Sequence, residues 1–414
     1  MNALRIGEAP ALALSFLYFL LLLASYYIVR PVRDALIAGL GVAEIKYLTA
    51  AVFFVMLAIA PVFGALMKHW PRHKLLPAIY GFFALNLACF AIAFESPHFG
   101  PWPARIFYVW LMVFNMFVVS VFWSFMADIW REEQGRRLFG AIAAGGSVGG
   151  LLGPLLAQRF VGAVGNSGLM WVAALLLSAT IVCIVALHRI SHASPRQESH
   201  ARADAERFSN SSWQGIALIS RSPFLLGIAG LVLIGAIVAQ FAYSETARLA
   251  KELIATPEAR TIFFARIDGW TNAVALVLQS LIVGPLSARL GIVAPMLGLP
   301  LIGLLAFGSL AVSPTLATLG ASNVARRAAE FGLGKPGRDM LYTVATPQEK
   351  YLAKNVIDTV ISRGGDLVGS WCYSAIAALG IALTGMSWIA MFAILGAIGL
   401  ALSVVRGYRS RGGK

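Results

Sequence analysis

The stretch from Ala325 to Asp366 reads ARRAAEFGLGKPGRDMLYTVATPQEKYLAKNVIDTVISRGGD. Its charged residues lie within or beside segments that are otherwise apolar enough to cross a lipid bilayer. An ionised side chain at membrane depth costs about 3 kcal/mol or more, so such groups normally face a partner or a water-filled cavity. This concentration of charge therefore marks a site inside a membrane protein.

The composition of the whole chain supports a membrane protein. Of its 414 residues, 59% are hydrophobic and 13% are charged, and the mean hydropathy is +0.77. Roughly 20 apolar residues cross a bilayer as a helix, and about twelve such stretches are present. They lack the alternation of barrel strands. The sequence predicts an all-α membrane protein with spans at 11–30, 47–67, 75–94, 106–127, 138–161, 168–188, 223–244, 262–287, 291–312, 315–334, 354–380 and 385–405.

The net charge of +14 is distributed as a topology signal. Basic residues gather in alternate short loops and in the C-terminal tail, which under the positive-inside rule places both termini in the cytoplasm. An even number of helices is then required, and twelve satisfies it. We expect a multi-pass protein of the bacterial inner membrane, with lipid around it and no nucleic-acid partner.

Two further sequence features bear on chemistry. The three cysteines lie in apolar spans without metal-ligand spacing, so we expect buried thiols and no metal. No G-x-x-x-x-G-K-[ST] motif is present, so gradients or exchange would have to drive any transport. We expect no cofactor and no enzymatic activity.

The two halves of the chain resemble each other. Ala144–Gly150 aligns with Arg363–Gly369, and both segments belong to the fifth helix of their half. Duplicated six-helix halves are typical of secondary transporters. The sequence therefore predicts two six-helix pseudo-repeats and a polar cytoplasmic linker, whose residues 211–221 form a short interfacial helix. The predicted domains are 1–188, 189–222 and 223–414.

The glycine-rich segment from Gly145 to Pro154 has two interpretations. Small residues let helices approach closely, and close packing alone explains Gly146 and Gly150. Alternatively, Pro154 and these glycines bend a helix that moves between two states.

The eighth span carries a polar stripe. Asp268, Asn272 and Gln279 share one helix face. Amide side chains can simply join neighbouring helices, but an aspartate aligned with them favours the lining of a cavity. We expect Asn272 to bind substrate and Asp268 to act in coupling or gating.

The eleventh span carries Lys354, Asp358, Ser362 and Asp366 at successive steps of four, which predicts one continuous polar face. Arg363 lies off that face but within reach of Asp366. A salt-bridged helix end, with Lys354 and Asp358 neutralising each other, is the simpler interpretation. It does not explain Asp366, which lies about three turns deeper.

Arginines mark the first and tenth spans. Arg326 and Arg327 precede Glu330, which can neutralise one of them. In the first span Tyr26, Arg30 and Arg33 share a face, and Pro31 is expected to interrupt the helix there. Arginine suits bidentate recognition of carboxylate or phosphate. Snorkelling to the interface is the competing explanation for Arg30 and Arg33.

Four segments together resemble the bacterial branch of the ATP:ADP antiporter family, a relative of the major facilitator superfamily. They are YYIVRPVRD (Tyr26–Asp34), FWSFMADIWREEQGRRLFGAIAAGGSVGG (Phe122–Gly150), ARRAAEFGLGKPGRDMLYTV (Ala325–Val344) and EKYLAKNVIDTVISRGGD (Glu349–Asp366). The resemblance implies two six-helix bundles that rock about a central cavity, and an organic anion as substrate, in the best-known members a nucleotide. The site residues it implies are Arg30, Arg33, Asp34, Arg326, Arg327, Glu330, Lys354, Asp358, Arg363 and Asp366.

We therefore expect a monomeric secondary transporter that moves an organic anion by alternating access, through exchange or with protons. The arginines, Tyr26 and Asn272 would bind the substrate, while the carboxylates and Lys354 would serve coupling or gating. Two alternatives stay open. One is a proton-coupled exporter of amphiphilic compounds that binds them on aromatic side chains, namely Trp110, Trp123, Phe125 and Trp270. The other is a membrane scaffold or sensor whose charges form structural ion pairs.

Overall fold

A computed structural model describes residues 8–69, 72–190 and 212–412. Within these ranges the chain is helical and has no strands, which confirms the predicted all-α class with its twelve helices. Nine of the described helices are long and apolar enough to cross a membrane. α5 is long enough to cross twice, and two further helical stretches, 316–341 and 349–378, both of which contain charged residues, are not among the nine.

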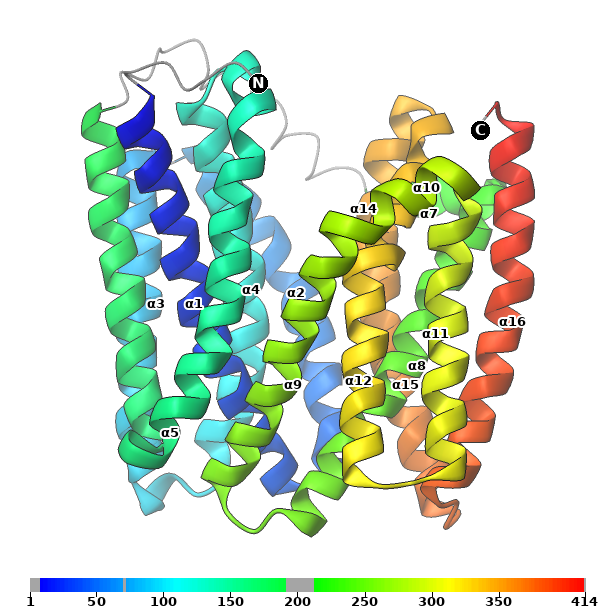
Figure 1. Ribbon diagram of the computed structural model, residues 1–414. Helices are drawn as coiled ribbons and strands as arrows, with labels where there is room; N and C mark the ends of the chain where they lie inside the picture. Colours follow the sequence, from blue (N-terminus) through cyan, green and yellow to red (C-terminus); the bar gives the residue numbers. More distant parts are fainter. Residues whose placement is uncertain (1–7, 70–71, 191–211, 413–414) are drawn as a thin grey trace. The chain divides into compact units, whose positions relative to one another are not determined.

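The α-helices follow the predicted spans (Figure 1). Their bounds are α1 Ala9–Leu40, α2 Val42–His69, α3 Arg72–Glu95, α4 Trp102–Ile129, α5 Glu132–Ile190, α7 Ser212–Arg221, α8 Pro223–Leu253, α9 Pro257–Val277, α10 Val283–Leu290, α11 Val293–Val312, α12 Leu316–Ala329, α13 Lys335–Leu341, α14 Lys354–Val356, α15 Ser362–Ala378 and α16 Leu383–Ser410. The short helix predicted over 211–221 is α7. The rest of the predicted linker, 191–211, lies outside the described residues.

Proline does not interrupt α1. The helix continues through Pro31 to Leu40, so the predicted interruption is wrong. Proline removes one backbone donor and crowds the preceding turn, which costs about 3 kcal/mol in a helix interior. The apolar residues on both sides are buried, among them Ile28, Val29 and Val32, and their packing outweighs that cost.

α5 turns at a glycine and not at its proline. Gly165 has φ 69° and ψ −179°, and it is the one residue with a non-helical backbone inside α5. The chain reverses there, and the second half of α5 runs back in the opposite direction to the first (Figure 1). Pro154 lies inside regular helix and is buried. Gly165 is therefore the turn between the predicted spans 138–161 and 168–188, and the hinge interpretation of Pro154 stays a prediction.

Close packing surrounds the glycines of α5. A Cβ atom on Gly146 would collide with the ring of Phe19, and one on Gly153 would lie 2.7 Å from the Cβ of Tyr27. Both partners belong to α1. Gly150 is buried on the same helix. These contacts support the packing interpretation of the glycine motif, because any larger residue would push α1 and α5 apart.

The chain divides into two compact units. Unit 1 comprises Met1–Ile37, Ala58–Ser209 and Ala255–Gly269, and unit 2 comprises Ala38–Leu57, Asn210–Ile254 and Trp270–Lys414. Residues 38–57 group with unit 2 and residues 255–269 with unit 1, so the units differ from the domains predicted from the repeat. The prediction of one bundle before and one after the linker stays a proposal.

Aromatic side chains form the core of unit 1. Phe19 stacks on Phe122 with ring centroids 4.1 Å apart, and Tyr18 donates a 2.5 Å hydrogen bond to the hydroxyl of Tyr80. The Tyr80 hydroxyl in turn donates to the carbonyl of Val118 at 3.2 Å. All the side chains in this chain of contacts are buried, so the two hydroxyls satisfy each other inside an apolar core.

In unit 2, α8 packs against α15 and α16, and α11 lies beside α16 (Figure 1). The charged segments of this unit contain π-helical turns at Leu278–Ile282, Glu330–Gly334, Glu349–Ala353 and Ile357–Ile361. Each such turn inserts an extra residue into a helix, and π turns occur frequently at functional sites. Here they coincide with the helices that the sequence selected for their charges.

Candidate functional site

Unit 1 places Arg30 beside Asp268. The Nε of Arg30 on α1 lies 3.7 Å from Oδ2 of Asp268 on α9, and the Arg30 guanidinium also lies 5.7 Å from the ring centre of Tyr27. The Asp268 side chain is 1% exposed and that of Arg30 is 16% exposed. The distance is too long for a hydrogen bond, and Arg30 Nε has no hydrogen-bond partner among the described residues. The contact between Arg30 Nε and Asp268 Oδ2 is therefore an electrostatic attraction without a hydrogen bond.

Arg33 and Asp34 form a tighter pair on the same helix. The Nε and Nη2 of Arg33 donate to Oδ1 of Asp34 at 2.9 and 2.6 Å, and Arg33 is 4% exposed. The guanidinium also lies over the ring of Tyr108 and donates to Sδ of Met112 at 3.6 Å. The Arg33 charge is thus already neutralised inside unit 1. This arrangement contradicts snorkelling to the interface as the explanation for Arg33.

Two predicted binding residues lie in different surroundings. Tyr26 is 7% exposed and packs edge-on against Tyr27, with ring centroids 5.1 Å apart. Asn272 on α9 is half-buried. The third member of the predicted stripe, Gln279, falls in the π turn Leu278–Ile282 and donates to the carbonyl of Phe331 at 2.9 Å. Gln279 therefore joins two helices of unit 2.

Arg326 lines a pocket in unit 2. The pocket holds about 80 Å³ between α8, α11, α12, the following turn and α16, and its other charged side chains are Glu330 and Arg338. The Nε of Arg326 is buried and has no hydrogen-bond partner among the described residues. Arg327 follows it on α12 and is half-buried. A buried guanidinium donor without a partner is costly, which makes Arg326 the member of this pocket that can take up an acceptor.

Glu330 has a partner that its spacing did not predict. Its Oε1 lies 2.7 Å from Nη1 of Arg338. In a regular α-helix, positions i and i+7 share a face. The π turn Glu330–Gly334 adds one residue, so position i+8 takes that place. Burial alone would lower the pKa of Arg338, but Glu330, with Asp358 and Asp339, outweighs it and raises the pKa.

Lys354 in the eleventh span has a different partner from the one its spacing suggested. Lys354 Nζ lies 2.6 Å from Oδ1 of Asp339, and Asp358 is exposed. The π turn Ile357–Ile361 adds one residue to this helix, so Asp366, eight residues after Asp358, returns to the same face. The continuous polar face stays a prediction. The pairing of Lys354 with Asp358 is wrong, because Lys354 pairs with Asp339.

The predicted pair at the deep end of this span is present. Arg363 Nη1 donates to Oδ2 of Asp366 at 3.2 Å, and both side chains are about one third exposed. The helix here is α15, which is regular, so the i, i+3 spacing holds. α15 also packs closely on α8, since a Cβ atom on Gly365 would lie 2.6 Å from the Cβ of Ala236.

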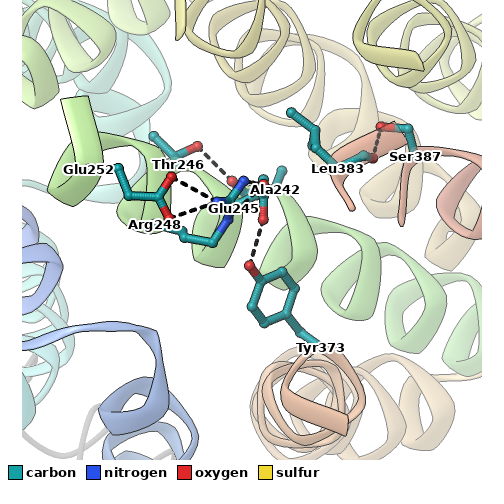
Figure 2. Close-up of polar contacts among 8 residues, drawn as sticks. All are labelled: Ala242, Glu245, Thr246, Arg248, Glu252, Tyr373, Leu383 and Ser387. Atoms are coloured by element: carbon teal, nitrogen blue, oxygen red, sulfur yellow. Dashed lines mark hydrogen bonds and ion pairs between the residues drawn. The ribbon is translucent and has the colours of Figure 1, made fainter. Parts of the chain in front are cut away.

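Sequence reasoning missed a buried polar cluster between α8 and α15, shown in Figure 2. Glu245 is 3% exposed and accepts hydrogen bonds from Tyr373 and Arg248. Arg248 also binds Glu252. The spacing of Glu245, Arg248 and Glu252 along one helix was an available signal. No such signal was available for Tyr373, because it lies on a helix far away in the sequence.

The arrangement can bind and neutralise anions in both units. Each unit has an arginine whose buried Nε lacks a hydrogen-bond partner among the described residues, and each has a carboxylate close by. Within the same described ranges there is no group of three or more His, Cys, Asp or Glu side chains that could hold a metal ion.

Comparison with known proteins shows the family and supports the fold. The model of the Major Facilitator Superfamily matches residues 12–334. No curated protein sequence matches the chain. Among solved structures, it is similar to a bacterial homologue of the iron transporter ferroportin in an inward-facing state, at 14% identity and a TM-score of 0.65, over 97% of this chain and 99% of the other.

Two further structures show the same fold. One is the nucleoside transporter NupG, at 13% identity and a TM-score of 0.64, over 97% of this chain and 99% of that one. The other is a bacterial homologue of the human lysosomal transporter Spinster, inward-facing and unoccupied, at 13% identity and a TM-score of 0.59, over 99% and 98%.

Proposed function

Because this chain belongs to the major facilitator superfamily, and is thus a multi-pass membrane transporter, we propose that it moves an organic anion by alternating access. The substrate is a nucleotide-like compound or another phosphorylated or carboxylated metabolite. Transport occurs by exchange or with protons. The proposal places a monomer in the bacterial inner membrane with both termini in the cytoplasm, as the basic loops favour.

One observation carries the choice of an anion. Arg30 and Arg326, from two different units, each have a buried Nε without a hydrogen-bond partner among the described residues. Leaving such a donor unpaired costs about 1–3 kcal/mol. A carboxylate or phosphate oxygen would remove that cost and add charge-assisted hydrogen bonds. A neutral acceptor would pair the donor without the charge assistance, and a cation would be repelled.

The size of the Arg326 pocket limits what it can receive as it stands. A water molecule occupies about 30 Å³ in the liquid, so a volume near 80 Å³ admits a few waters or one small anionic group. Drug-sized ligands need pockets of about 300 Å³ or more. The substrate would thus present one charged group to Arg326, and the pocket would have to widen to take more.

Asp268 gives Arg30 a means of coupling. Its carboxylate faces the guanidinium at 3.7 Å. An incoming anion would compete for Arg30 and weaken the attraction that keeps Asp268 ionised. In proton coupling, Asp268 would then accept a proton. In exchange, the bound anion would leave only when another anion replaces it. The Arg33–Asp34 pair would stay neutral throughout and stabilise the same segment of α1.

Reconstitution into liposomes tests the proposal. Uptake of a labelled nucleotide, a phosphorylated sugar and a dicarboxylate is measured with and without internal counter-substrate, and with and without a pH gradient. Arg30→Gln and Arg326→Gln should each abolish most of the anion flux. Arg266→Gln is the matched control, since Arg266 is exposed on the same helix as Asp268. Anion flux that survives in both variants contradicts the site.

The same assay decides between the proposal and its alternatives. Flux of amphiphilic compounds that needs a pH gradient and ignores every anion would favour an exporter. Of the aromatic side chains named for that function, Trp110 stacks on Phe114 at 5.1 Å against the core of unit 1, whereas Trp270 is exposed. Absence of any flux would favour a scaffold.

A further inference from the structure

The cluster around Glu245 has no place in the site described so far. Glu245 lies on α8, a membrane-crossing helix, and is 3% exposed. Its Oε2 accepts a 2.5 Å hydrogen bond from the hydroxyl of Tyr373 on α15, and its Oε1 accepts one of 3.0 Å from Nε of Arg248 (Figure 2). A buried carboxylate needs hydrogen-bonding partners, and Tyr373 and Arg248 supply them.

Arg248 is shared between two carboxylates. Its Nε and Nη2 point to Glu245, while Nη1 donates to both oxygens of Glu252 at 2.7 and 2.8 Å. If Glu245 loses its charge, Arg248 keeps a partner that is already in place. The usual penalty for breaking a buried ion pair, an uncompensated buried charge, is therefore avoided.

Exposure differs along the Glu245 cluster. Glu252 is 50% exposed, Arg248 is 36% exposed and Glu245 is 4% exposed by side chain. The cluster thus runs from the solvent-exposed Glu252 to the buried Glu245.

We propose that Glu245 is a proton-binding site that couples protonation to the contact between α8 and α15. The proton comes from water and binds Oε1, on the side of Arg248, which then pairs with Glu252 alone. Oε2 continues to accept from Tyr373, but that hydrogen bond loses its charge assistance and weakens. α15 also carries Arg363 and Asp366, which the sequence predicted to act in substrate binding and coupling, so loosening this contact would move that predicted pair. This inference rests on the proposed transport function.

The charged and polar groups near Glu245 come from three helices. On α8 they are Arg248 and, one turn further, Glu252 and Lys251, whose Nζ donates to the carbonyl of Leu40. α15 contributes Tyr373. On α12 the neighbouring polar side chain is Asn323, which does not titrate and donates to Thr246 at 2.5 Å. Glu245 is thus the buried carboxylate of this cluster.

Two transport assays separate coupling from transport itself. In liposomes, wild type should show both substrate exchange and uphill uptake driven by a pH gradient. Glu245→Gln mimics the protonated form, so it should keep exchange and lose the pH-driven uptake. Glu252→Gln is the matched control on the same arginine and should keep both. Undiminished pH-driven uptake in Glu245→Gln overturns the inference.

If the protein moves none of the solutes, that result counts against the proposed function alone. A spectroscopic measurement then still tests the inference. Infrared difference spectra of purified wild type, recorded as the pH is lowered, should show a band of a buried protonated carboxylic acid. Glu245→Gln should lack that band and Glu252→Gln should retain it. A wild-type spectrum unchanged by Glu245→Gln overturns the inference.

Discussion

Glu330 and Arg338 form an ion pair of 2.7 Å across a π-helical turn. Both residues line the pocket that contains Arg326. Glu330 and Arg338 neutralise each other. Among the described residues that line the pocket, Arg326 is therefore the positive charge that can bind a ligand. A change of one residue in helix register thereby decides which arginine can bind an anion.

We predict that Glu330→Gln destabilises unit 2 by about 1 kcal/mol, since the pair is one fifth to one third exposed and is partly screened. The Arg338→Gln variant should lose a similar amount. The double variant should lose less than the sum, because neither charge is then left without its partner. Denaturant unfolding of the three purified variants measures this, and strictly additive losses would contradict the pairing.

Two adjacent glycines of α15 make a matched pair for packing. A Cβ atom on Gly365 would lie 2.6 Å from the Cβ of Ala236 and 3.1 Å from the carbonyl of Leu233, whereas one on Gly364 would meet nothing closer than 3.9 Å. We predict that Gly365→Ala destabilises the protein by about 1–3 kcal/mol, and that Gly364→Ala leaves stability unchanged or slightly raised.

The apparent melting temperature in detergent measures both glycine variants. The comparison removes the general effect of alanine on helix propensity, because both positions lie in the same regular helix. If Gly364→Ala is as harmful as Gly365→Ala, the close approach of α8 and α15 is wrong.

The sequence predicted helix positions well and helix registers poorly. Apolar runs mark spans directly, and the Arg363–Asp366 pair followed from i, i+3 spacing because α15 is regular. A π turn has no signature in composition, so the partners of Glu330 and Lys354 could not be foreseen. The Glu245–Tyr373 bond depends on which helices pack together, which spacing along one helix does not encode. Pro31 shows the opposite error, in which a local rule was overridden by packing.

Acid should destabilise the end of α16 through Glu349. Burial alone would raise the pKa of Glu349, but the backbone amide of Thr346 and the guanidinium of Arg411 outweigh it and lower the pKa. An unfolded glutamate titrates near pH 4.3. The stabilisation from a lowered pKa is fully present above that pH and is lost as the pH falls through the folded pKa.

We therefore predict that Arg411→Gln lowers the melting temperature at neutral pH and flattens its decline in acid. Arg411 also donates to Ser222 at 3.1 Å and lies over the ring of Phe224, so part of the loss is independent of pH. Arg409→Gln is the control, since Arg409 is exposed two residues earlier. Equal acid slopes in wild type and Arg411→Gln would refute the role of this pair.

Removing the charge of Asp268 should strengthen anion binding and slow transport. In wild type the carboxylate competes with the substrate for Arg30 at 3.7 Å. Asp268→Asn removes that competitor, and a gain of about 1 kcal/mol would lower Kd roughly fivefold. The same change removes the group that would displace the anion, so release and maximal exchange should fall. Glu258→Gln on the same helix is the control. Weaker anion binding by Asp268→Asn in a correctly folded protein would show that Asp268 serves to hold Arg30 in place and does not compete with the substrate.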